Sequence, residues 1–135
     1  MESKKTILVV DDEPDAIKFV EAVLSNVGDY TVISSSDGPD CLQRVQEETP
    51  DLIILDIMMP EMDGFKVFYE LRNNASTKDI PIIMLTGVAD KVGIRFFKKD
   101  MKDYMGSEPA EYIEKPLDPA KLQDAVQWVF ETYPV

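Results

Sequence analysis

The sequence predicts an α/β fold in which helices cover both faces of a parallel β-sheet. Three observations lead to this prediction. Short apolar runs alternate with helical patterns along the 135 residues, as in successive βα units. The runs are mostly continuous, which is typical of strands that are buried on both faces. Four of the runs end at a carboxylate, a hydroxyl or an ammonium group, and such strand ends share one edge of a parallel sheet.

The first half of the chain contains three predicted strands and two predicted helices. The strands cover residues 7–10, 30–34 and 51–55. The first helix opens at Glu13 and Pro14, and its apolar residues recur with a period near 3.6 until Gly28 ends it. The second helix starts at residues 38–39 and closes at residues 49–50.

The second half continues the alternation with two more strands. Residues 63–64 lead a helix whose predicted inner face carries Phe65, Phe68 and Leu71. A strand over 80–85 is followed by an apolar helical stripe within 88–105, and a short strand covers 112–114. Asp118 and Pro119 cap and start the last helix. Its predicted inner face carries Leu122, Ala125, Val126, Val129 and Phe130.

This succession of βα units restricts the topology of the sheet. Right-handed crossovers leave few arrangements of five parallel strands, and the flavodoxin-like, doubly wound order 2-1-3-4-5 is the leading one. The length suits one core. We therefore expect a single domain over residues 1–135 with no output domain, and a ligand site outside the carboxyl ends of the strands.

Composition excludes several functions. A net charge of −12 argues against direct binding to nucleic acid. The absence of histidine excludes histidine-based catalysis and histidine zinc sites. The single Cys41 permits no internal disulfide, which fits a reducing compartment. The sequence shows neither a membrane-spanning apolar stretch nor a signal peptide, so we expect a cytoplasmic protein.

The strand ends together predict a site for phosphoryl chemistry. Asp11 and Asp12 follow the first strand, Asp56 the third, Thr86 the fourth and Lys115 the fifth. Mg²⁺ prefers oxygen ligands, and a bound cation relieves repulsion between neighbouring carboxylates. An aspartate can attack phosphorus to form an acyl phosphate, while a lysine and a hydroxyl neutralise the oxygens of the transferred group.

Each of these residues also has a purely structural interpretation. Asp11 and Asp12 can cap the first helix, and Asp56 can be a turn residue at a strand end. Thr86 can cap a following helix, and Lys115 can be a solvated lysine. The joint pattern favours the functional interpretation, because chance rarely places all of these groups at one predicted edge.

These residues resemble the receiver domain of two-component response regulators, the CheY-like superfamily. The resemblance is carried by VVDDEP at residues 9–14, by DIMMPEMDG at residues 56–64, by PIIMLTG at residues 81–87 and by KP at residues 115–116. It covers nearly the whole chain, and the combination of motifs is highly specific.

The resemblance implies a role for each site residue. Asp56 accepts a phosphoryl group from a histidine kinase or phosphotransfer protein, in a reaction that needs Mg²⁺. The metal ligands are Asp12, Asp56 and the backbone carbonyl of Met58, with Asp11 binding directly or through water. Lys115 pairs with the phosphoryl group, and its bond to the following proline is often cis.

The resemblance also implies two switch residues. Thr86 moves to bind the phosphoryl group, and Tyr112 matches an aromatic side chain that swings inward with it. Tyr112 can equally be a half-buried strand tyrosine. The expected output is a changed surface on the fourth helix, fifth strand and fifth helix. An unknown downstream protein reads this surface, and pairing of two copies through the same face is left open.

The resemblance is weakest between Thr86 and Lys115. This stretch is several residues longer than is common in the family, and residues 106–110 replace the usual Gly-Ala pair. Val88 and Met58 stand at positions that influence hydrolysis of the acyl phosphate, and neither can orient a water molecule by hydrogen bonding. We therefore hypothesise a long-lived phosphoryl state.

A basic stretch also falls in this part of the chain, and Phe96 lies within it. It consists of Lys91, Arg95, Lys98, Lys99 and Lys102. The stretch is either a solvated face that balances an acidic protein or a docking face for an acidic partner, with Phe96 as an anchor.

The predicted function is a phosphorylation-dependent signalling switch, which catalyses only its own phosphorylation and slow autodephosphorylation. Two alternative functions remain. In the first, the chain is a receiver cut from a longer regulator. In the second, it is an aspartate-nucleophile phosphohydrolase. The second alternative requires another aspartate two residues after Asp56, where this sequence has Met58.

Overall fold

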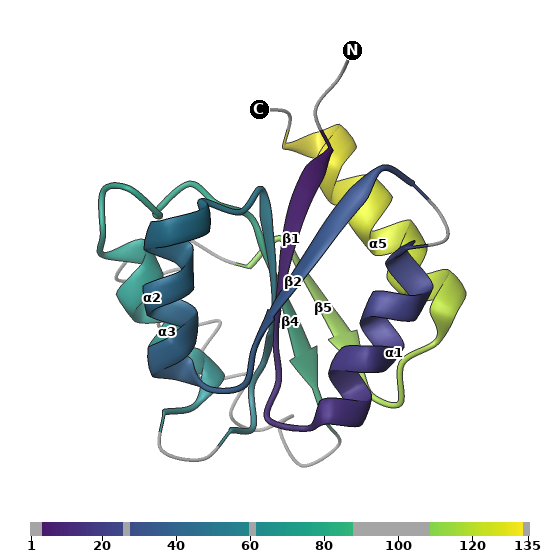
Figure 1. The fold of residues 1–135 in the computed structure, drawn as a ribbon, viewed down its shortest axis with the longest axis horizontal. Helices are drawn as coiled ribbons and strands as arrows, with labels where there is room; N and C mark the ends of the chain where they lie inside the picture. The colour runs from purple at the N-terminus through teal and green to yellow at the C-terminus, as the bar shows by residue number, and fades with distance from the viewer. Residues whose placement is uncertain (1–3, 26–27, 60–61, 88–108, 134–135) are drawn as a thin grey trace.

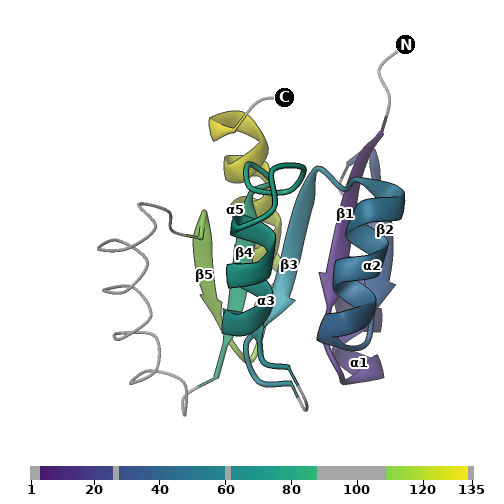
Figure 2. The same ribbon diagram turned by 90° about the vertical axis from the view of Figure 1, so that its left-hand side faces the viewer.

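The sheet has the predicted parallel topology. The computed structural model describes residues 4–25, 28–59, 62–87 and 109–133, and its five parallel strands lie in the order β2-β1-β3-β4-β5 (Figure 1). The strands are β1 (Lys5–Val10), β2 (Tyr30–Ser35), β3 (Leu52–Asp56), β4 (Ile82–Thr86) and β5 (Glu111–Glu114). This arrangement confirms the flavodoxin-like fold and places β5 at one margin of the sheet (Figure 2).

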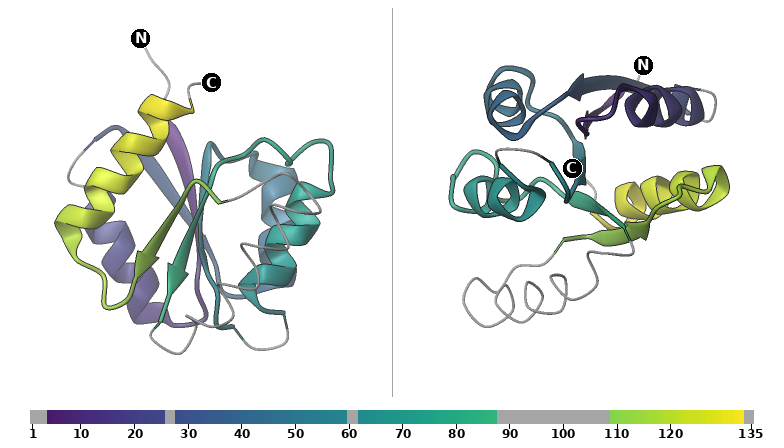
Figure 3. Two further views of the ribbon diagram at one scale, coloured as in Figure 1. Left: turned by 180° about the vertical axis from the view of Figure 1, so that it is seen from behind. Right: turned by 90° about the horizontal axis from the view of Figure 1, so that it is seen from below.

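Helices cover both faces of the sheet, as the sequence predicts. One face carries α1 (Pro14–Ser25) and α5 (Pro119–Thr132), and the other carries α2 (Gly38–Glu48) and α3 (Gly64–Arg72) (Figure 3). The predicted helical stripe within 88–105 lies outside the described residues.

Two apolar cores result from the alternation of strand side chains. In β1, Ile7 and Val9 pack toward α1 and α5, whereas Leu8 and Val10 pack toward α2 and α3. The strands β3 and β4 alternate in the same way. Because side chains of successive strand residues point to opposite faces, continuous apolar runs fill both cores at once.

Aspartates cap three of the helices. The carboxylates of Asp37, Asp63 and Asp118 each accept a backbone N–H from the first turn of α2, α3 and α5, and each such cap stabilises its helix by about 1 kcal/mol. The predicted Asp118 cap is therefore confirmed. The inner face predicted for α3 is confirmed, since Phe68 and Leu71 are buried in this core and Phe65 packs against it, and Val67 is buried there as well.

Three predicted strands end one residue too early, since β2 ends at Ser35, β3 at Asp56 and β4 at Thr86. Asp56 is the last residue of β3 and lies opposite Leu85 of β4, and Thr86 is the last residue of β4. Pairing with the neighbouring strand extends β4, since the backbone N–H of Lys115 donates to the carbonyl of Thr86. The predicted start of β4 at Ile80 is also wrong, because the Ile80 N–H donates to the carbonyl of Thr77 in a turn.

Candidate functional site

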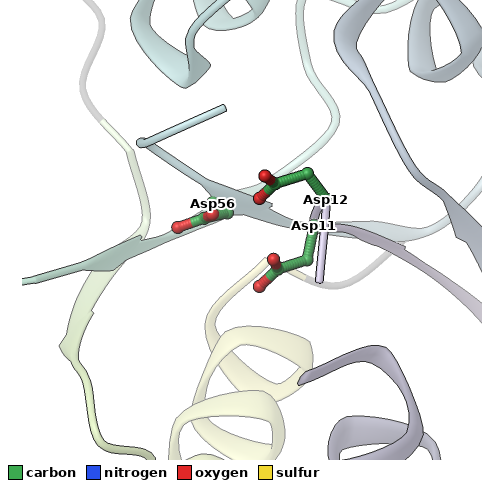
Figure 4. Close-up of side chains that lie close together, drawn as sticks. All are labelled: Asp11, Asp12 and Asp56. Atoms are coloured by element: carbon green, nitrogen blue, oxygen red, sulfur yellow. The ribbon is translucent and has the colours of Figure 1, made fainter. Parts of the chain in front are cut away.

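Three carboxylates converge at the carboxyl edge of the sheet. One oxygen from each of Asp11, Asp12 and Asp56 lies within 4.8 Å of the others, and Figure 4 shows the three side chains close together at the ends of their strands. Asp11 and Asp56 are buried, whereas Asp12 is exposed. The structure thus brings Asp56 next to two acids that precede it by more than forty positions in the sequence.

Strand register accounts for this convergence. Val10 of β1 lies opposite Leu55 of β3, so the residues that follow them, Asp11 and Asp56, are neighbours at the strand ends. The backbone N–H of Asp11 donates to the carbonyl of Ser35, which ties the end of β1 to β2.

Asp11 has a structural role as well as a place in the cluster. Its Oδ1 accepts the backbone N–H of Glu13 at 3.0 Å, just before α1 begins. The helix-entry interpretation of Asp11 therefore holds for one oxygen. The other oxygen, Oδ2, faces the cluster and contacts Lys115.

Lys115 supplies a positive charge to the cluster. Its Nζ lies 3.0 Å from Oδ2 of Asp11 and 3.3 Å from Oδ1 of Asp56. The backbone positions this side chain directly after β5, and the Lys115–Pro116 peptide bond is cis, as the resemblance implies. Asp11 and Lys115 are 104 residues apart in sequence, so this pair depends on the assembled sheet.

The described side chains of the site carry more negative than positive charge. Burial, followed by the charge of Asp11, raises the pKa of Asp56 to about 6, although Lys115 opposes this shift and Asp12 adds to it. Burial also acts to lower the pKa of Lys115, but its bonds and charge interactions with Asp11 and Asp56 outweigh burial and raise that pKa. One ammonium group does not neutralise three carboxylates, and a bound cation would relieve this repulsion.

The donor set fits Mg²⁺. Mg²⁺ binds through a few carboxylates while keeping several waters, and the three carboxylates here offer oxygen ligands within a short distance of one another. Asp12 is exposed, so water can reach the cluster. This acidic cluster is consistent with a magnesium site.

The loop after β3 turns one side chain into solvent. Ile57 and Met59 are 1% and 8% exposed, but Met58 between them is 62% exposed. The buried neighbours anchor the loop against the core that contains α2 and α3. The role expected for the Met58 carbonyl stays a prediction.

The two predicted switch residues lie on neighbouring strands. Thr86 is 6% exposed at the end of β4, one residue beyond the partner of Asp56. Tyr112 lies opposite Met84 in the β4–β5 register and packs, partly buried, against the core that contains α2 and α3. The basic stretch, Phe96 and Val88 lie outside the described residues.

Gly64 is a site-supporting residue that the sequence pattern identified only as a helix start. Its N–H donates to the carbonyl of Ile57 at 2.8 Å. A Cβ at this position would lie 2.4 Å from the backbone oxygen of Asp56 and 2.8 Å from Cα of Ile57. A side chain therefore cannot fit unless the backbone that carries Asp56 moves.

An apolar hollow borders the site on the side of α1. It has a volume of about 240 Å³ and is lined by Glu13, Ala16, Phe19, Lys115, Pro116 and Leu117. Phe19 is 37% exposed in this hollow. The hollow and the acidic cluster share Lys115, and sequence periodicity alone did not reveal this surface.

A doubly wound sheet with an acidic cluster and a lysine at its switch point defines a class of α/β proteins that bind ligands at strand ends. Within that class, residues 7–127 match the family model described as the response regulator receiver domain. The chain belongs to this family.

Curated relatives share this region of sequence. The chain is 39% identical over 129 residues to the probable transcriptional regulator ycf27 of Guillardia theta, covering 96% of this chain and 46% of that protein. It is 36% identical over 123 residues to the alkaline phosphatase synthesis transcriptional regulatory protein PhoP of Bacillus subtilis (strain 168), covering 91% of this chain and 47% of that protein. The chain thus spans about half the length of these relatives.

Solved structures show the same architecture. The chemotaxis response regulator CheY4 of Vibrio cholerae superposes with a TM-score of 0.79 at 27% identity, covering 93% of this chain and 98% of that chain. A response regulator receiver domain protein from Clostridium thermocellum superposes with a TM-score of 0.81 at 25% identity, covering 95% of each chain.

These likenesses identify a signalling module and are consistent with phosphorylation-dependent signalling. The proteins to which the chain is similar are named as regulators and receiver domains. Within the described ranges, no helix is long and apolar enough to cross a membrane.

Proposed function

We propose that this chain is a phosphorylation-dependent switch in which Asp56 accepts a phosphoryl group from a phosphohistidine on a partner kinase or phosphotransfer protein. The observation that carries this proposal is the convergence of Asp11, Asp12 and Asp56 around the ammonium group of Lys115. Residues 1–135 act as one receiver domain in this proposal.

In the proposed step, a carboxylate oxygen of Asp56 forms a bond to phosphorus. The P–N bond to the donor histidine breaks, and the imidazole leaves with the bonding electron pair. Lys115 holds one phosphoryl oxygen by charge, and the Thr86 hydroxyl donates to another. The transition state of phosphoryl transfer is loose, so the reaction needs mainly alignment of the reactants and neutralisation of charge. The side chains of Lys115 and Thr86 are both held at the ends of strands.

Asp11, Asp12, Asp56 and the carbonyl of Met58 would hold Mg²⁺. The ion would supply positive charge for the phosphoryl oxygens, which the site otherwise lacks. The raised pKa of Asp56 is the property that this added charge would offset, because a nearby cation favours the ionised carboxylate.

A small phosphodonor tests the chemistry directly. We expect incubation with acetyl phosphate and Mg²⁺ to add one phosphate to the intact mass of the protein, and we expect Asp56→Asn to lose this adduct. Asp51→Asn is the matched control, because Asp51 stands at the opposite end of the same strand run. Absence of an adduct in the folded wild-type protein, or an adduct that persists in Asp56→Asn, would overturn the proposal.

The apolar hollow beside the site is a docking surface for the phosphodonor protein in this proposal. A donor that delivers a phosphohistidine to Asp56 must cover the surface around Lys115, and the hollow with exposed Phe19 adjoins it. We expect Phe19→Ala to slow transfer from a phosphorylated kinase while leaving phosphorylation by acetyl phosphate unchanged. Equal slowing with both donors would show that Phe19 acts on the fold instead.

The alternative of a phosphohydrolase lacks support because Met58 stands where that chemistry needs an acid. That chemistry needs a second acid two residues after the nucleophile, and the side chain there is Met58, directed into solvent. The alternative of a receiver within a longer regulator shares the same acceptor chemistry. In both forms we propose that phosphorylation changes the surface near β5 and α5, which an output partner reads.

A further inference from the structure

A groove runs between β5 and α5, away from the acidic cluster. It has a volume of about 450 Å³, within the size range of ligand sites, and β5 is the outermost strand of the sheet. The groove is lined by Glu111, Tyr112, Ile113, Glu114, Lys121, Asp124, Ala125 and Trp128.

The helical side of the groove is a single stripe of α5. Lys121 and Trp128 each lie three or four residues from both Asp124 and Ala125, which places the four residues on one helix face. Trp128 is 44% exposed, and its ring meets Tyr133 edge to face with centroids 6.2 Å apart. A large indole therefore stays in contact with solvent at the wall of a groove, although it is braced from one side.

The charge of the lining identifies the class of ligand. Among the residues that the structure describes, Glu111, Glu114 and Asp124 contribute three carboxylates to the lining, whereas Lys121 contributes one ammonium group. An aromatic face attracts cations, and tryptophan is the most favourable ring for this interaction. Carboxylates beside an exposed indole complement a guanidinium group with attached apolar carbons.

We propose that the β5–α5 groove binds a cationic segment of a partner protein, in which an arginine stacks on Trp128 and pairs with Glu111 or Asp124. The proposal rests on the proposed function for the place of the output surface and names the chemistry of the partner that this surface takes. The groove is present in the unphosphorylated chain, so binding can be measured separately from phosphorylation of Asp56. The proposal commits to a basic partner, in contrast to the acidic partner that the basic stretch of residues 91–102 would suit.

Trp128 is the one tryptophan of the chain, so its fluorescence reports on this groove. The probe is the peptide acetyl-Leu-Arg-Leu-Arg-amide, and the control peptide has glutamine in place of arginine. We expect the arginine peptide to change the emission of Trp128 in a saturable manner, with weaker binding at higher ionic strength. The glutamine peptide is expected to produce no saturable change.

Charge variants separate the groove from the general acidity of the protein. We expect Glu111→Gln combined with Asp124→Asn to weaken binding about tenfold, as the loss of two exposed charge pairs implies. Glu47→Gln combined with Glu48→Gln changes the same net charge on exposed positions of α2 and is expected to leave binding unchanged. Circular dichroism shows whether each variant is folded.

Three results would overturn the proposal. The first is no saturable response to the arginine peptide by the folded protein. The second is equal weakening by the α2 variant, which would indicate only long-range attraction to an acidic protein. The third is equal binding of the glutamine peptide, which would make the groove an apolar surface without preference for a cation.

Discussion

An aspartate stands at each end of β3, Asp51 directly before the strand and Asp56 as its last residue, and the two carboxylates have different partners. At the amino end, Asp51 accepts the backbone N–H of Thr6 at 2.8 Å, and its own N–H donates to the carbonyl of Thr6. At the carboxyl end, Asp56 faces two other acids and one lysine. The amino end thus satisfies its carboxylate with the main chain, whereas the carboxyl end keeps negative charges close together.

This difference has an energetic cost at the carboxyl end. The pKa of Asp56 is raised to about 6, first by burial and then by Asp11, which means that the fold disfavours its charged form. Shifted pKa values of this kind are common at functional sites. Five predictions test the contrast between the two edges of the sheet.

The largest effect is expected from Gly64→Ala at the site edge. The new Cβ would lie 2.4 Å from the backbone oxygen of Asp56, so we expect the free energy of unfolding to fall by about 3 kcal/mol. We also expect slower phosphorylation by acetyl phosphate, because the backbone that carries Asp56 must shift. Urea titration measures the first effect, and intact mass over time measures the second.

Gly28→Ala is the matched control at the other edge. Its Cβ would meet the ring of Tyr30 at 3.1 Å, and that side chain can move by a few tenths of an ångström. We expect the free energy of unfolding to change by no more than about 0.5 kcal/mol. Equal destabilisation by the two substitutions would contradict the claim that Gly64 is held by the site backbone.

Asp56→Asn is expected to stabilise the metal-free protein. Above pH 6 the charged carboxylate opposes folding, so its removal should raise the free energy of unfolding by about 1–2 kcal/mol, after a discount for the solvent at the sheet edge. The measurement is urea unfolding in EDTA at pH 7.5.

The pH dependence of the wild type has a defined sign. The folded protein binds the Asp56 proton more tightly than the unfolded chain does, since the folded pKa is about 6 and the ordinary value is 3.8. This contribution to the free energy of unfolding therefore falls as the pH rises from 4 to 6. The difference between wild type and Asp56→Asn should grow over that window, and a constant difference would contradict the raised pKa.

Asp51→Ala is expected to change the free energy of unfolding in the opposite direction to Asp56→Asn. It removes the acceptor of the Thr6 N–H, which should lower the free energy of unfolding by about 1 kcal/mol. Asp51→Asn retains an acceptor oxygen and should cost less. Stabilisation by Asp51→Ala would remove the distinction between the two ends of β3.

The smallest effect is expected from Met58→Asn. An amide at this exposed position can orient a water molecule toward the acyl phosphate, so we expect the phosphoryl lifetime to shorten roughly threefold, or about 0.7 kcal/mol in the barrier. Loss of phosphate from the purified phosphoprotein, followed by intact mass, measures this lifetime. An unchanged lifetime would show that the side chain of Met58 does not limit hydrolysis, and loss within seconds in the wild type would contradict the long-lived state.

Sequence periodicity was sufficient to predict the sheet and its strand order. Continuous apolar runs require burial on both faces, and right-handed crossovers then leave few topologies. The boundaries of β3 and β4 were less predictable. They depend on hydrogen bonds between strands, such as the bond from Lys115 N–H to Thr86, which no local pattern encodes.

The sequence by itself determined which groups could meet, because the position of a polar residue at the end of an apolar run follows from local pattern. Only the tertiary structure decided what each group does. Asp51 and Asp56 flank the same apolar run, but Thr6 satisfies the first, while Asp11 and Lys115 surround the second. The space around Gly64 and the groove at Trp128 were likewise set by packing. Charge interactions and steric contacts act through space, so they depend on residues that only the assembled sheet brings together.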